Sequence, residues 1–269
     1  MNRQYVVSLF ARKWLRAVGV RSAALIAALG LAGAAHAQVI FDSTDSPLPG
    51  NIPSLGYQAT QTAEFGNEIT FAGTNRQIGN VEIIMSDWAN QADYPGVGDA
   101  TGWDHPITLS FYNPGSGTSV GSLIASETIV AHVPWHTANG FSGTAFPVNF
   151  DFTGTTLPNT VIFGVSYNTE TWGANPIGTP GPYDSLNYGL SQTGPSVGAD
   201  VNPDDAYWNT STAANYTDGG AAGVGVFRQD TNWTPYSAEI QVNAVPEPAS
   251  MALFAVGSLA LLAGWRRSH

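Results

Sequence analysis

The segment Phe146-Pro147-Val148-Asn149-Phe150-Asp151-Phe152 decides the fold class of this 269-residue chain. Every second position of the segment holds phenylalanine or valine, and polar Asn149 and Asp151 stand between them. Successive side chains of a β-strand point to opposite faces. The alternation therefore predicts a strand with one buried face and one face in water.

Apolar and β-branched runs like this one recur along the chain, and Gly, Pro, Asn and Asp fill the gaps between them as turns require. Away from the two termini, no segment of helical length shows a 3.6-residue period. Short strands without interleaved helices predict an all-β protein, an antiparallel β-sandwich of jelly-roll type. The expected strands are Glu68–Ala72, Asn80–Met85, Ile107–Tyr112, Leu123–Val133, Phe146–Phe152, Val161–Tyr167, Leu186–Leu190, Val224–Phe227 and Ala238–Val242.

Two long insertions interrupt the expected strands. One is Asp87–Pro106, and the other is Thr171–Gly223, which is rich in Gly, Pro, Asn, Ser and Thr. Loops of this length in a compact domain commonly carry function. We therefore expect binding residues in these two insertions.

The N-terminus is typical of a secretory signal. Several Arg and Lys residues precede the apolar stretch Ala23–Gly33, and Ala35-His36-Ala37 places alanine at the two positions that a signal peptidase reads. We expect residues 1–37 to be a signal peptide that is cleaved after Ala37. The alternative is a permanent N-terminal membrane anchor, which the short Ala/Gly-rich run suits less well.

The body between the two ends, residues 38–245, is strongly acidic and contains no lysine. It carries nineteen Asp and Glu residues against only Arg76 and Arg228, which gives a formal charge of −17. Such a surface repels nucleic acid and anionic lipid and attracts divalent cations. The chain has no cysteine, so the exported body must be stabilised by core packing without disulfides.

The body offers little catalytic chemistry. It has no nucleophile elbow, zincin motif, phosphate-binding loop or dinucleotide-binding glycines. His132 and His136 are four residues apart, but Pro134 between them favours a loop with two solvated imidazoles. Glu64 and Glu68 have the chemistry of a glycosidase pair, yet nothing distinguishes them from the other acids. We expect a non-catalytic protein, with a secreted glycan hydrolase that uses paired carboxylates as the alternative.

One loop has the oxygen-rich composition of a calcium site. Asp200, Asn202, Asp204 and Asp205 alternate in the manner that Ca²⁺ ligands require, although the glycine and distal glutamate of an EF-hand are lacking. The alternative is an Asx/Pro turn at a strand end. Asp93, Asp99 and Asp104 in the first insertion form a weaker second candidate.

Three tryptophans in the insertions are candidate contacts for a glycan. Trp103, Trp172 and Trp208 each have Asp or Asn nearby, so a ring could stack on a sugar while the polar group binds a hydroxyl. The alternative is that these rings close the ends of the sandwich, because Trp is usually well buried.

The C-terminus has three features in order: Pro246-Glu247-Pro248, an apolar run, and Arg266-Arg267. Residues 249–265 are just long enough to be a transmembrane helix, and the arginines would hold the end on the cytoplasmic side.

This ordered tail resembles the PEP-CTERM sorting signal of Gram-negative bacteria, a tail also labelled the ice-binding protein C-terminal domain, which is no evidence of ice binding. The resemblance covers residues 246–269. It implies a transient membrane anchor, cleavage near Pro-Glu-Pro by an exosortase-type enzyme, and release to the cell surface or the exopolysaccharide matrix. Segments of the body, such as "AGTNRQIGNVEIIMSDWA", resemble uncharacterised exported bacterial proteins, which imply no activity.

Overall fold

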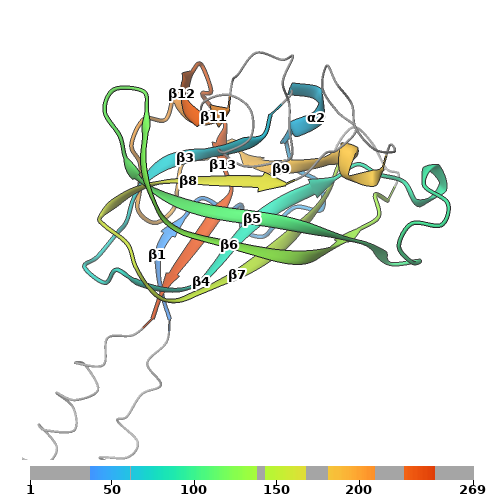
Figure 1. The fold of residues 1–269 in the computed structure, drawn as a ribbon, viewed down its shortest axis with the longest axis horizontal. Coiled ribbons are helices and arrows are strands. Elements are labelled where there is room, and N and C mark those ends of the chain that lie inside the picture. The colour runs from blue at the N-terminus through green and yellow to red at the C-terminus, as the bar shows by residue number, and fades with distance from the viewer. Residues whose placement is uncertain (1–36, 61, 138–142, 168–180, 210–226, 246–269) are drawn as a thin grey trace, which may run out of the picture. The chain divides into compact units, whose positions relative to one another are not determined.

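Two antiparallel β-sheets pack face to face in the computed structural model of the body (Figure 1). The structure describes residues 37–60, 62–137, 143–167, 181–209 and 227–245. The first sheet contains β7 (Thr144–Thr156), β4 (Gln77–Asp87), β14 (Ile240–Ala244) and β1 (Gln38–Asp42), with β9 (Leu186–Ser191), β2 (Ser54–Gly56) and β13 (Ser237–Ala238) continuing beside the end of β4. The second sheet runs β12 (Phe227–Thr231), β11 (Asp205–Asn209), β3 (Glu64–Thr70), β8 (Thr160–Tyr167), β5 (Gly102–Pro114), β6 (Val120–Pro134), and β10 (Ala199–Asp200) pairs with β3.

The strand order is that of a jelly roll. Neighbours in the first sheet include β1-β14-β4-β7, and neighbours in the second include β3-β8-β5-β6. The chain therefore passes repeatedly from one sheet to the other, as in the two Greek keys of this architecture. The described helices are short: α2 (Tyr57–Thr60), η1 (Gln91–Asp93) and η2 (Pro182–Ser185).

The alternation in β7 is confirmed. Phe146, Val148, Phe150 and Phe152 are buried between the sheets, while the residues between them are exposed. Pro147 is tolerated within the strand because β7 pairs with β4 on one side only. The inward faces of β4, β5 and β8 complete one continuous apolar core.

The first insertion is shorter than predicted. β4 extends to Asp87 and β5 begins at Gly102, so residues 88–101 form the loop and Trp103 lies in a strand. Pro106 is compatible with a strand here because the ladder between β5 and β8 begins at Ile107. The second insertion contains β9, which matches the strand expected at Leu186–Leu190. It also contains β10 and β11, which the sequence pattern did not reveal because both are short and flanked by turn residues.

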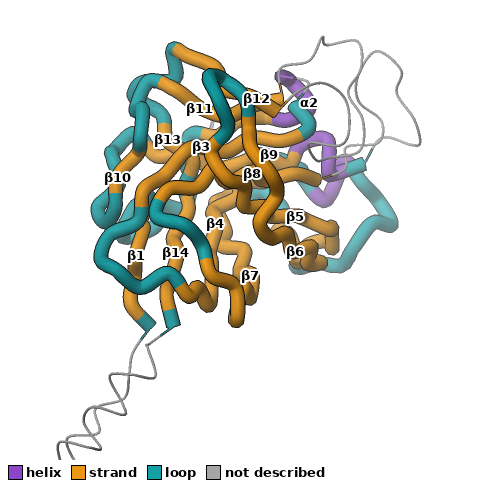
Figure 2. The backbone as a smooth tube through the Cα atoms, turned by 60° about the vertical axis from the view of Figure 1, so that its left-hand side comes forward, coloured by secondary structure: helices purple, strands orange, loops and turns teal. Residues whose placement is uncertain are grey.

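The two ends of the body lie side by side (Figure 2). β1 pairs with β14, and Gln38 lies opposite Ala244. Ala37 is exposed directly before β1. The predicted signal peptide up to residue 36 and the predicted helix 249–265 lie outside the described residues. Within the described residues, none of the helices has the length and apolar character to cross a membrane.

Candidate functional site

A buried carboxyl group lies where β4 ends, on the face that looks between the sheets. Val81, Ile83 and Met85 of β4 are buried, and Asp87 continues the same parity with no exposed surface. Burial raises the pKa of Asp87 to about 7, although backbone N–H groups and the Trp103 indole act in the opposite direction. Neither carboxylate oxygen makes a hydrogen bond of normal geometry within the described residues. This group therefore keeps its proton to a higher pH than an ordinary carboxyl group does.

Aromatic rings close this end of the sandwich. The ring centroids of Trp103 and His105 are 5.3 Å apart, and His105 also stacks on Tyr183 at 5.4 Å. Tyr57 and Tyr167 stack at 4.3 Å, and the hydroxyl of Tyr57 donates to the Val165 carbonyl at 2.5 Å. Because Trp103 is only 3 % exposed, its ring is packed as a lid and is not displayed at the surface.

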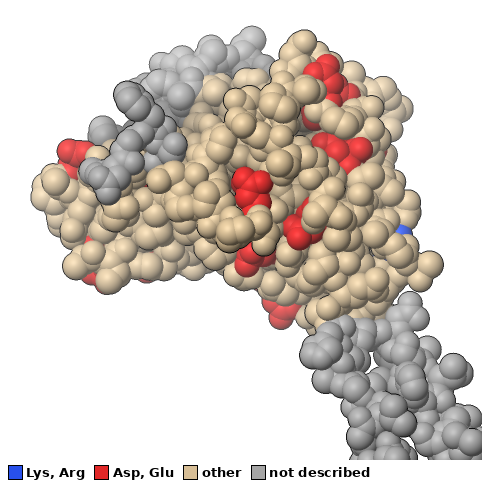
Figure 3. Space-filling model, turned by 180° about the vertical axis from the view of Figure 1, so that it is seen from behind, with Lys and Arg blue, Asp and Glu red and all other residues tan. Residues whose placement is uncertain are grey.

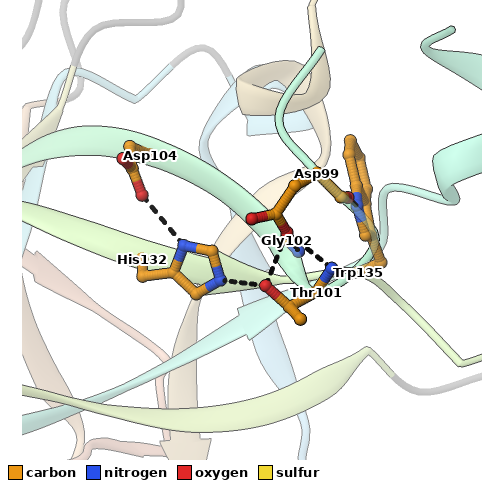
Figure 4. A network of polar contacts seen from close by, with 6 residues as sticks. All are labelled: Asp99, Thr101, Gly102, Asp104, His132 and Trp135. Atoms are coloured by element: carbon orange, nitrogen blue, oxygen red, sulfur yellow. Dashed lines mark hydrogen bonds and ion pairs between the residues drawn. The ribbon is translucent and has the colours of Figure 1, made fainter. Parts of the chain in front are cut away.

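A polar network lies on the surface next to these rings (Figure 4). The Nδ1 of His132 is 2.9 Å from Asp104 Oδ1, and its Nε2 is 3.1 Å from Thr101 Oγ1. Thr101 in turn donates its backbone N–H to Asp99 Oδ1 at 2.6 Å and its hydroxyl to the same atom at 2.5 Å. The backbone carbonyl of Asp99 accepts from the Trp135 indole at 2.7 Å. The hydrogen bonds to Thr101 lower the pKa of Asp99.

The contacts of this network follow the order of a nucleophile, a histidine and an acid, but the Thr101 hydroxyl donates its proton to Asp99 Oδ1. That proton is therefore directed at a carboxylate and not at His132 Nε2, which is the contact that a histidine base would need in order to activate Thr101.

The predicted calcium loop is arranged as a turn. Asp200 accepts from the Asn202 backbone N–H at 3.1 Å and from Asn67 Nδ2 at 2.7 Å. Asp205 accepts from Gln229, and Asp204 is exposed. Burial, with the charges of Asp205 and Glu68, raises the pKa of Asp200 to about 6. No three acidic, His or Cys side chains in the described ranges are placed to hold one metal ion, and calcium binding stays a prediction.

Of the other two predicted glycan contacts, the structure describes Trp208 and does not describe Trp172. Trp208 is half-buried on β11 and meets Trp233 edge-to-face at 5.5 Å. Trp172 lies outside the described residues, as do Ala35, Pro246, Glu247, Pro248, Arg266 and Arg267.

Sequence reasoning missed the two most deeply buried acids with raised pKa values. Burial and the charges of Asp45 and Asp42 raise the pKa of Glu239 to about 7, while the Asp45 backbone N–H donates to its Oε2 at 3.2 Å. The burial of Asp87 could have been predicted from its position, because it comes two residues after Met85 in the alternating series Val81, Ile83, Met85. For Glu239 the signal was its place between apolar Ala238 and Ile240.

Comparison with known families identifies the tail and not the body. A family model described as the PEP-CTERM protein-sorting motif matches residues 244–268. Neither the search of curated proteins nor the search of solved structures found a match. PEP-CTERM signals are recognised by exosortase-type enzymes, so the chain carries the tail of an exported, membrane-processed protein.

Proposed function

We propose that the body is a non-catalytic component of the bacterial cell surface or exopolysaccharide matrix, released there after its sorting tail is removed. The observation that carries the proposal is the position of the sorting motif. Its match begins within β14, the last strand of a self-contained sandwich, so cutting after that strand leaves the sandwich complete. The acidic body supports a soluble, self-repelling component. Figure 3 shows acidic groups spread over one face with little basic surface.

Processing at both ends is the first test. We expect protein released from the producing cell to begin at Gln38 and to end near Pro246–Pro248, and intact-mass spectrometry measures both ends. Cells that lack the exosortase-type enzyme provide the control, and their protein should keep its tail and stay with the membrane. A soluble extracellular form with an intact C-terminus would contradict the sorting proposal.

We propose a glycan as the ligand of the body and Trp208 as its contact residue. Among the predicted contact residues that the structure describes, Trp208 is the most accessible. Its ring is half-buried beside Trp233, and the backbone N–H of Trp233 donates to the carbonyl of exposed Asp204 at 3.0 Å. Neutral polysaccharide would bind directly. Acidic polysaccharide would need a bridging cation such as Ca²⁺, because the body carries −17.

Two tryptophan variants separate binding from packing. We expect Trp208→Ala to weaken retention on neutral polysaccharide with little change in Tm, while Trp103→Ala costs about 3–5 kcal/mol of stability as a buried ring. Affinity electrophoresis and thermal unfolding measure the two effects. If the wild-type body is not retained by any polysaccharide, the ligand proposal fails, and release of new reducing ends would instead favour the hydrolase.

A further inference from the structure

The chain between β3 and β4 holds both ends of the body. The Val245 backbone N–H donates to the Gln77 carbonyl at 2.9 Å, and Asn75 Nδ2 donates to the Val245 carbonyl. Both backbone polar groups of the last residue before Pro246 are therefore bonded. Val245 also packs closely on Gly79, where an added Cβ would lie 2.9 Å from Val245 Cγ1.

The same segment holds the N-terminal strand. The Ala72 backbone N–H donates to the Ile40 carbonyl of β1 at 2.8 Å. Asn75 is only 8 % exposed, and its Oδ1 accepts from the Gln77 N–H at 3.1 Å, which fixes the amide that reaches Val245. One short segment thus ties the first and last strands to β4.

Arg76 organises this segment. Its guanidinium donates to the backbone carbonyls of Asn75 at 2.7 Å, Gly73 at 2.8 Å and Ala72 at 3.2 Å. It also reaches Asn159 Oδ1 of the neighbouring turn and lies 5.7 Å from the centre of the Phe71 ring. A guanidinium has five N–H donors in a fixed fork, so a single side chain can fix a whole turn in this way. In a body with two cations, this one satisfies a turn and pairs with no carboxylate among the described residues.

We propose that residues 71–76, organised by Arg76, act as a clamp that fixes the end of the folded body at Val245 and confines proteolytic removal of the tail to bonds after that residue. A protease cuts an exposed, unpaired stretch of backbone, so a cut within β14 requires the strand to open first. β14 is paired with β1 on one side and β4 on the other, and the clamp closes its last residue. The clamp does not depend on the proposed function, whereas its consequence for tail processing rests on it.

Limited proteolysis of the full chain in detergent, with a broad-specificity protease, tests the clamp without any sorting enzyme. Intact mass gives the C-terminus of the resistant body. For the wild type we expect it at or just after Val245. For Arg76→Ala and Asn75→Ala we expect ends within Ile240–Ala244, formed roughly tenfold faster, since cleavage follows the population of the open strand.

Asn80→Ala is the matched control, because Asn80 is an exposed residue near the start of β4, outside the clamp, and its amide donates to Asn149 Oδ1 at 2.9 Å. It should behave as the wild type. If Arg76→Ala unfolds the whole body, as circular dichroism would show, Asn75→Ala decides, because it removes the contact with Val245 and leaves the guanidinium in place. An unchanged end and rate in Asn75→Ala would overturn the clamp. If the proteolysis results support the clamp but protein released from cells still carries its tail, the sorting proposal is refuted and the clamp is not.

Discussion

The folded body should become more stable as the pH is lowered from 8 to about 5. Burial raises the pKa of Asp87 from 3.8 to about 7 and that of Glu239 from 4.5 to about 7. When the pH lies between the ordinary pKa of each group and its raised pKa, the folded protein keeps a proton that the unfolded chain has released. The free energy of unfolding is therefore highest when both groups are protonated, and it falls as the pH rises through 4 to 7.

For Asp87 alone, the conversion of about 1.4 kcal/mol per pKa unit gives a loss of about 4 kcal/mol between pH 4 and pH 8. Glu239 and Asp200 act in the same direction. Asp99 and Asp151 have lowered pKa values and act in the opposite direction, so stability should decline again below about pH 4. We expect the maximum near pH 4–5.

Asp87→Asn tests the origin of this dependence, because asparagine is a neutral mimic of the protonated carboxyl. The variant should melt higher than the wild type at pH 8, match it near pH 4.5, and show a shallower dependence between them. Thermal unfolding at fixed ionic strength measures this, with replacement of an exposed acid, Asp204→Asn, as the control for loss of one surface charge. A wild-type Tm that rises from pH 5 to pH 8 would contradict the assignment.

Replacing Phe150 by alanine should cost about 3–5 kcal/mol of stability, the usual range for a buried phenylalanine. Phe150 is 1 % exposed and lies opposite Val81 of β4. Its neighbour Asn149 is exposed on the other face of the strand, so Asn149→Ala should change stability by no more than about 0.5 kcal/mol. Urea unfolding of the two variants compares adjacent positions directly. Equal losses would show that β7 does not present alternate residues to the core.

Period-2 alternation made the fold class predictable, and β7 shows why. A half-buried strand must place its apolar residues at every second position, so its buried face can be predicted from the sequence alone. β5 was only partly visible because Trp103, Asp104, His105 and Pro106 also have the composition of a loop. Their strand character comes from pairing with β6, whose partner residues are 24 to 30 positions further on.

The candidate site was less predictable because its properties arise from contacts between strands distant in sequence. Trp103 looked like an exposed binding ring, and only the opposing sheet shows that it is buried. The Asp200 loop had the composition of a cation site, but Asn67 and Asn202 already occupy the Asp200 carboxylate. The PEP-CTERM motif could be recognised from the sequence because it is a local run of residues, and the family model matches it at residues 244–268.

The pairing of β1 with β14 makes folding depend on the completeness of the chain. Gln38 can pair with Ala244 only after almost the whole body has been synthesised, because the two residues lie at its opposite ends in the sequence. Until then the first half of β4 also lacks its neighbour on that side, because Ile240 pairs with Ile83 and Ala244 with Ile78. Contacts so distant along the chain form late and slowly. A polypeptide truncated before β14 would keep two unpaired strand edges, which favour degradation or aggregation. The first sheet is therefore completed only in a chain that includes its last described strand.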